Sequence, residues 1–219
     1  MKIALASAPV RDGDTAYNLT QMAQFIWQAK EQRADLVCFG EAYLQGFDAL
    51  SWKFEADRTT AASVHSPVFQ IIAGWTKDTG VDVLFGFLER EGEAIYSACA
   101  LVAGGVLTHC SRRLSGDWIS EKADDHYRTG AALMAFDYGG KQCSVALGSD
   151  LRNFQAKFRG KQDCLFWLAN MQWDVDCIRL ADEVSGQVFL INPLADGCSW
   201  ITDGVVRKSQ SAGLLLAEI

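Results

Sequence analysis

Three places in the sequence carry residues that could do chemistry, and each follows the end of an apolar, strand-like run. They are Glu41, the pair Arg112-Arg113 and the triplet Gly148-Ser149-Asp150. Strand ends of this kind are where α/β enzymes tend to place reactive side chains. A carboxylate, a fixed cation and a group on a sharp turn are the parts needed to activate a nucleophile and stabilise an oxyanion. The turn, however, begins with a glycine, so its first position has no side chain that could react.

Each of these features also has a plain structural interpretation. Taken alone, Glu41 is an ordinary loop acid, Arg112-Arg113 is a solvated strand end, and Gly148 is a turn glycine with backbone freedom. The stretch Asp124-Asp125-His126 could be drawn as metal ligands, but a charged surface loop explains it more simply. With three histidines and no CxxC pair in the sequence, we expect no metal and no cofactor.

The hydrophobic pattern predicts the elements that must position these residues. Helical spacing predicts a helix over residues 15–32, capped by Asp14 or Thr15, and a second one over 66–79. Gly104-Gly105 and Gly139-Gly140 predict two hairpins. The expected hairpin strands cover 94–103, 106–113, 131–137 and 141–147. The other expected strands cover 2–8, 36–39, 81–88, 163–169, 187–192, 198–201 and 213–219, with further helices over 153–159 and 174–185.

Strand–helix units at both ends with hairpins between them indicate two mixed sheets rather than one parallel sheet. Mixed sheets need helices on their outer faces, so the predicted fold is α/β (α+β), a four-layer αββα sandwich. The sequence has no repeat and no linker-like stretch. We therefore expect one domain over residues 1–219.

Composition limits the partners and the compartment. A net charge of −7 and a pI near 4.9 argue against a nucleic-acid partner, which needs a basic surface. No apolar run has the length of a membrane span, so we expect no membrane association. Seven cysteines without a CxxC pair favour reduced thiols and a cytoplasmic protein.

Together, three segments resemble the carbon–nitrogen hydrolases, the nitrilase superfamily. Residues 36–47 (LVCFGEAYLQGF) resemble the strand, glutamate and turn of that family, 112–114 (RRL) its lysine segment, and 145–152 (VALGSDLR) its nucleophile segment. Further matches in the family's order are Asp14, Asn18, residues 127–130, Trp173, Asn192 and residues 197–199.

The resemblance implies a cysteine thiolate that attacks an amide, carbamoyl or nitrile carbon, a glutamate base and a lysine that stabilises the oxyanion. Position by position, Glu41 matches the base. Arg113 replaces the lysine, with Arg112 as the one-residue alternative, and Gly148 replaces the nucleophile. Candidate binding residues are Asp124 (or its neighbour Asp125, at the place of an auxiliary glutamate), Asp150 and Trp173.

Neither nearby nucleophile is a good substitute. In extended backbone the side chain of Ser149 would point away from the face addressed by position 148, and Cys143 lies on the opposite face of the same predicted strand. The leading interpretation is a pseudoenzyme that keeps the scaffold to bind a small amide- or carboxylate-like molecule or for assembly. The alternatives are an active amidase-type hydrolase that uses Ser149 or a water activated by Glu41, and a purely structural role with a filled pocket.

Two structural predictions follow from the resemblance. Arginine is longer than lysine and can offer two parallel donors, so Arg113 should reach across the space above Gly148 and pair with Glu41. Family members commonly pair through outer helices, so a homodimer is expected. Apolar residues after Asn153 and Asp174, namely Phe154, Phe158, Ile178 and Leu180, could form its face, and their helical spacing is explained equally well by ordinary core packing.

Overall fold

The computed structural model describes residues 1–172, 175–184, 186–194 and 197–219. In chain order its elements are β1 (Lys2–Ser7), α1 (Thr15–Glu31), β2 (Leu36–Cys38), α2 (Phe54–Asp57), α3 (Pro67–Thr79), β3 (Asp82–Glu91), β4 (Ala94–Ala103), β5 (Val106–Arg112), β6 (Ala135–Tyr138), β7 (Lys141–Leu147), α4 (Asp150–Phe158), β8 (Cys164–Leu168), α5 (Val175–Val184), β9 (Gln187–Ile191), β10 (Cys198–Thr202), β11 (Val205–Gln210) and β12 (Gly213–Glu218).

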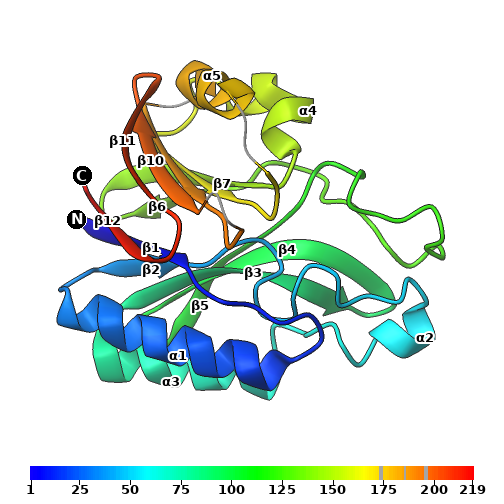
Figure 1. The fold of residues 1–219 in the computed structure, drawn as a ribbon. Coiled ribbons are helices and arrows are strands. Elements are labelled where there is room, and N and C mark those ends of the chain that lie inside the picture. Colours follow the sequence, from blue (N-terminus) through cyan, green and yellow to red (C-terminus); the bar gives the residue numbers. More distant parts are fainter. Residues whose placement is uncertain (173–174, 185, 195–196) are drawn as a thin grey trace.

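The strands form two six-stranded mixed sheets, in the orders β12-β1-β2-β3-β4-β5 and β11-β10-β9-β8-β7-β6. Each sheet has three parallel strands, β1-β2-β3 or β7-β8-β9, with antiparallel strands on both sides. Helices α1 and α3 cover the outer face of the first sheet and α4 and α5 that of the second (Figure 1). The predicted αββα sandwich is confirmed.

Period-two alternation along the strands builds the layers. In β1, Ile3 and Leu5 enter the core between the sheets, whereas Ala4 and Ala6 face α1 and α3. In β8, Phe166 lies in the core between the sheets and Trp167 in the core under α4 and α5. Because successive side chains of a strand point to opposite faces, strands of continuous apolar sequence can fill two cores at once.

Both predicted glycine hairpins are present. Gly104 and Gly105 have φ of +57° and +87°, and Gly139 and Gly140 have +59° and +73°. Two consecutive residues with positive φ form the tight turn that matches the twist of an antiparallel pair. β6 begins at Ala135 rather than at residue 131, because pairing with β7 starts only there. The sequence patterns missed α2, which has a single turn, and β11, which is a polar edge strand (VVRKSQ).

The expected exposed apolar face on α4 and α5 is only partly present. Phe158 and Leu180 are 0% and 7% exposed and belong to the core under these helices, so the expectation is wrong for them. Phe154 packs against that core with partial exposure, and Ile178 is half-buried. Helical spacing placed Phe158 and Leu180 toward the sheet because an amphipathic helix buries its apolar stripe. Among the described residues, no helix is long and apolar enough to cross a membrane.

Candidate active site

Glu41 lies just beyond β2, in a buried turn that packs against β3. A Cβ atom added at Gly86 of β3 would lie 2.5–2.6 Å from atoms of residues 40–42. Only a glycine allows so close an approach of two backbones. The carboxylate is 2% exposed, and its Oε1 accepts a 2.8 Å hydrogen bond from Ser97 Oγ of β4. The sheet therefore holds this carboxylate in a fixed, dry position.

Arg113, rather than Arg112, faces Glu41. Its main chain is fixed by hydrogen bonds from its N–H to Ser97 O (2.8 Å) and from Gly130 N to its carbonyl (2.7 Å). Arg112 points to the other face, where its Nε lies 2.6 Å from Glu89 Oε2 and its guanidinium covers the ring of Tyr96. The alternation of side chains at the end of β5 thus turns Arg113, and not Arg112, toward Glu41.

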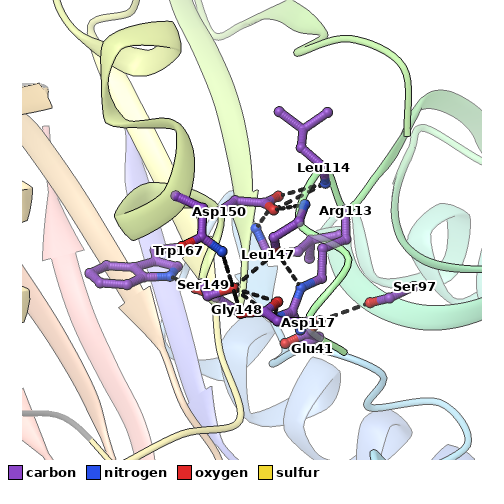
Figure 2. A network of polar contacts seen from close by, with 12 residues as sticks. Glu41, Ser97, Arg113, Leu114, Asp117, Leu147, Gly148, Ser149, Asp150 and Trp167 are labelled. Atoms are coloured by element: carbon purple, nitrogen blue, oxygen red, sulfur yellow. Dashed lines mark hydrogen bonds and ion pairs between the residues drawn. The ribbon is translucent and has the colours of Figure 1, made fainter. Parts of the chain in front are cut away.

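The guanidinium of Arg113 is at the centre of a polar network (Figure 2). Nη1 donates to Glu41 Oε1 (2.8 Å) and Nε to Ser115 Oγ (2.8 Å). Nη2 donates to Asp117 Oδ1 (2.7 Å) and Ser149 Oγ (2.9 Å). The predicted ion pair of Arg113 with Glu41 is confirmed. The expected pair of parallel donors is not present, because Nη2 contacts Asp117 instead of the second oxygen of Glu41.

Gly148 lies directly under this guanidinium. It has φ of +50°, its N–H donates to Leu168 O (2.9 Å), and its carbonyl accepts from Trp167 Nε1 (2.7 Å). A Cβ at this position would lie 2.5 Å from Cζ of Arg113 and would also overlap Nη1. The arginine therefore fills the space into which a side chain at position 148 would extend.

Ser149 lies in the same cluster, contrary to the expectation that it would point away. Its Oγ donates to Asp117 Oδ1 (2.7 Å) and lies 3.0 Å from Ser115 Oγ. The expectation assumed extended backbone, but the chain turns at Gly148, and Ser149 (φ −84°, ψ 5°) is the N-cap residue of α4. Its hydroxyl makes no cap hydrogen bond, because it is used within the cluster.

Asp150 anchors the loop that follows Arg113. Its carboxylate accepts hydrogen bonds from the main-chain N–H groups of Ser115 (2.7 Å), Leu114 (3.0 Å) and Leu147 (3.3 Å). Burial raises the pKa of Asp150, while these hydrogen bonds oppose that rise. The residue connects the end of β7 to the loop after β5 and so positions the arginine indirectly.

Electrostatics keeps Arg113 charged. Burial lowers its pKa, but the charge of Glu41 and the hydrogen bond between them raise it, and the net direction is upward. Burial raises the pKa of Glu41 above its ordinary value, with the charge of Arg113 and the bond from Ser97 acting against it. For Asp117, whose side chain is 50% exposed, burial is outweighed by the hydrogen bond from Ser149 and the charge of Arg113, which lower its pKa.

Asp124, the predicted counterpart of an auxiliary glutamate, lies outside this cluster. Asp124 Oδ2 accepts from the main chain of Phe54 at the start of α2 (2.8 Å), and its Oδ1 lies 2.8 Å from His126 Nδ1. These partners give Asp124 a role in fixing α2. Trp173 lies outside the described residues. No group of three or more potential metal ligands occurs within the described part of the chain.

Three members of the cluster were not predicted. Ser97 carries a hydroxyl within the apolar strand AIYSACALVA. A polar residue in a buried strand needs a hydrogen-bond partner, so the sequence could have marked Ser97 as a member of a polar cluster. Ser115 and Asp117 are in the polar stretch directly after Arg113-Leu114. Their position depends on how the loop folds back over Gly148, which local sequence does not specify.

Comparisons with solved structures give the same fold. The chain is similar to an amidase from Nesterenkonia sp. AN1, solved after Michael addition of acrylamide at its active-site cysteine (TM-score 0.83, 16% identity, 100% of this chain and 93% of that one). It is also similar to a CN-hydrolase superfamily protein from Xanthomonas campestris that carries an arsenic adduct in its active site (TM-score 0.84, 16% identity, 99% and 89%).

Sequence comparison adds the family. An (R)-stereoselective amidase from Pseudomonas sp. is 32% identical over 126 residues, which are 57% of this chain and 43% of the amidase, so less than half of that relative is matched. Residues 2–121, more than half of the chain, match the family description "Carbon-nitrogen hydrolase". This range contains Glu41 and Arg113, whereas Gly148 lies beyond it. The chain belongs to the carbon–nitrogen hydrolase family.

Proposed function

We propose that this protein is a pseudoenzyme that lacks cysteine-dependent hydrolysis of amides and nitriles. The observation that carries the proposal is the position of the Arg113 guanidinium in the space above Gly148. By family resemblance, that space belongs to the nucleophile. Loss of the nucleophile in a covalent mechanism costs roughly 10⁴–10⁶-fold in rate.

The state of Glu41 supports the same conclusion. Its Oε1 accepts hydrogen bonds from both Ser97 and Arg113 at 2.8 Å. A general base must be within reach of the proton that it removes, whereas this carboxylate is buried beneath an arginine. A water activated by Glu41 would need the guanidinium to move first.

The retained role that we propose is the binding of a small amide- or carboxylate-like molecule at the edge of this cluster. Asp117 is half-exposed there, and Asn153 Nδ2 lies 3.4 Å from its Oδ2 and 3.3 Å from Ser149 Oγ. A carboxylate acceptor beside an amide donor complements the N–H and C=O groups of a primary amide. A carboxylate ligand would accept a hydrogen bond from Asn153 Nδ2.

Activity assays on matched variants test the proposal. The native protein should hydrolyse simple amides, nitriles and N-carbamoyl amino acids no faster than the buffer. Gly148→Cys alone should stay inactive, because its side chain overlaps Arg113, whereas Gly148→Cys with Arg113→Lys should gain activity. Gly148→Cys with Arg112→Lys is the control, since Arg112 faces Glu89. Turnover by the native protein that Glu41→Gln abolishes would overturn the proposal.

We further propose that the protein is a cytoplasmic homodimer. No disulfide joins its seven cysteines in the described structure, which suits a reducing compartment. The partly exposed Phe154 and Ile178 on α4 and α5 are the apolar residues left for a two-fold contact. Sedimentation of the native protein should give a dimer at micromolar concentration, and a monomer there would contradict this assembly.

A further inference from the structure

Helices α1 and α3 carry no charged side chain over most of their length. They lie side by side on the outer face of the first sheet, opposite to α4 and α5 (Figure 1). Residues 15–29 of α1 and 67–76 of α3 include no Asp, Glu, Lys or Arg, although 21% of the chain is charged. By contrast, α4 contains three charged residues and α5 four. A solvent-facing helix usually carries charges on its exposed side, so their absence indicates that this side is covered.

An apolar groove with exposed side chains runs between these two helices. Its volume is about 710 Å³, and none of its nine lining residues is charged. Trp27 of α1 and Ile71 of α3 line the groove and are 45% and 46% exposed. Leu19 and Trp75 are half-buried along it. The residues of α1 and α3 that line this groove are called the α1–α3 face below. Contiguous exposed apolar surface of this kind marks a site of association in soluble proteins.

The charge of the chain favours a second copy as the occupant of this face. Each copy has a net charge of −7, so two copies repel one another where their acidic surfaces meet. A face without charges avoids that repulsion and buries no unpaired charge. The two ends of α1 are also complementary, because residues 11–14 have a net charge of −1 and residues 30–33 of +1. Two antiparallel α1 helices place each negative end beside a positive end and oppose their macrodipoles.

The side chains of α1 fit a second α1 in the antiparallel direction. Four residues of the face follow one another at spacings of four, three and four, namely Ala16, Thr20, Ala23 and Trp27. This is the spacing of a coiled-coil seam, in which side chains of one helix enter gaps of the other. In an antiparallel pair centred between Thr20 and Ala23, Trp27 of each copy lies over Ala16 of the other. The largest side chain of the seam then meets one of the smallest, so the seam is complementary to itself.

α3 takes part in the same arrangement. Strands β1, β2 and β3 are parallel, so the helices between them run in the same direction. Lys30 Nζ donates to the carbonyl of Asp78 (3.2 Å), which places the C-terminal ends of the two helices together. Ile71 is seven residues before Asp78 and Ala23 is seven before Lys30, so Ile71 lies level with Ala23. The exposed Ile71 is thus close to the centre of the arrangement, where it meets its counterpart.

We propose that a second copy of this chain binds the α1–α3 face about a two-fold axis, with the two α1 helices antiparallel. Helices of 17 and 13 residues are about 25 and 20 Å long and about 10 Å wide, which gives about 450 Å² of face per copy. The total of about 900 Å² is at the low end for a specific contact, so the association is weak. It is separate from the proposed contact of α4 and α5, which lie on the opposite outer face (Figure 1).

Sedimentation equilibrium of the full chain from about 5 to about 500 μM covers the range of a weak contact. The weight-average mass of the native protein should increase with concentration and exceed that of a dimer at the upper end. Trp27→Glu brings a charge into the face of each copy and should weaken this association at least about tenfold. Val205→Glu is the matched control, because Val205 is 50% exposed and lies on β11 of the other sheet. It adds the same charge and should behave like the native protein.

Phe154→Gln separates the two contacts. It removes an apolar side chain from α4 and weakens the α4–α5 contact, so a monomer should replace the dimer at low concentration. The increase of mass with concentration should remain, because Phe154 is outside the α1–α3 face. Failure of the α4–α5 dimer is therefore distinguishable from failure of the contact proposed here.

Cysteine cross-linking tests the antiparallel register. Ile71→Cys places a thiol close to the two-fold axis, so mild oxidation should give a covalent dimer. Ala16→Cys places a thiol on the same face but eleven residues, or about 16 Å along the helix, from its counterpart. A disulfide needs Cα atoms within about 7 Å, so Ala16→Cys should not cross-link. The native cysteines are common to both variants and do not affect the comparison.

Three results would overturn the proposal. They are a native mass that does not change with concentration, equal association of Trp27→Glu and Val205→Glu, and cross-linking of Ile71→Cys that is no stronger than that of Ala16→Cys. Flotation of the native protein with phosphatidylcholine vesicles, lost in Trp27→Glu and without self-association, would assign the face to a lipid surface instead.

Discussion

Replacing Arg113 by methionine should leave the buried carboxylate of Glu41 without its ion-pair partner. The arginine side chain is 6% exposed, that of Glu41 is 1% exposed, and they are joined at 2.8 Å. Methionine keeps much of the length of the side chain but removes every donor. Asp117 is half-exposed and can be solvated after the change, whereas Glu41 cannot. Removing one partner of a buried ion pair costs about 3–5 kcal/mol. We therefore expect the free energy of unfolding of the variant at pH 7 to be lower than that of the native protein by this amount.

The loss should depend on pH in a defined direction. Burial raises the pKa of Glu41 and the charge of Arg113 opposes that rise, so without the arginine the pKa rises further. A folded-state pKa above the unfolded value of about 4.3 means that the folded protein retains a proton that the unfolded chain has lost. The free energy of unfolding then decreases as pH rises from about 4 through the folded pKa. The variant should be closest to the native protein near pH 4 and furthest from it above pH 7.

Urea unfolding followed by tryptophan fluorescence at several pH values measures this effect. Arg113→Met combined with Glu41→Gln should recover at least about 1 kcal/mol at pH 7, because a neutral amide is less costly to bury than a carboxylate. Arg159→Met is the control, since Arg159 is 61% exposed and pairs with Glu183 on the surface, where such pairs are worth about 0–1 kcal/mol. A loss below about 1 kcal/mol for Arg113→Met, or a loss independent of pH, would refute the reasoning.

Three further substitutions test other parts of the structure by urea unfolding. Gly148→Ala should lower the free energy of unfolding by at least about 2 kcal/mol, because φ at this position is positive and the added Cβ would overlap Arg113. The loss should be smaller when Arg113→Lys is also present, and equal losses in the two backgrounds would contradict the overlap. Trp167→Phe should cost about 1–3 kcal/mol by leaving the carbonyl of Gly148 without its donor; no loss would argue against that bond. Burial acts to raise the pKa of Asp57, but hydrogen bonds, the largest from Tyr127, lower it overall. The stability that Asp57 contributes above about pH 3.9 is therefore lost as pH falls through its folded pKa. Asp57→Asn should cost about 1–3 kcal/mol at pH 7 and flatten the native decline below pH 4; an unchanged decline would count against this assignment.

The sequence by itself determined the layers of the fold and the glycine at position 148, on which the proposed loss of the nucleophile rests. Strand–helix units at both ends with hairpins between them predict two mixed sheets covered by helices, and consecutive glycines permit the positive φ values of the two hairpin turns. Both are local properties, and both predictions were confirmed. The three ordered segments were sufficient to indicate the family, and the absence of a side chain at Gly148 is visible in the sequence itself.

Tertiary structure decided which side chains meet. The register of β5 against β4 shifts between Leu101 and Val102, and a one-residue irregularity reverses the faces of all later side chains. Counting along the sequence therefore could not choose between Arg112 and Arg113. Ser149 reaches the cluster because its segment folds onto the loop after β5, although it is 36 residues from Arg113 and 32 residues from Asp117 along the chain. Such long-range contacts are set by the packing of the two sheets, which no local pattern encodes.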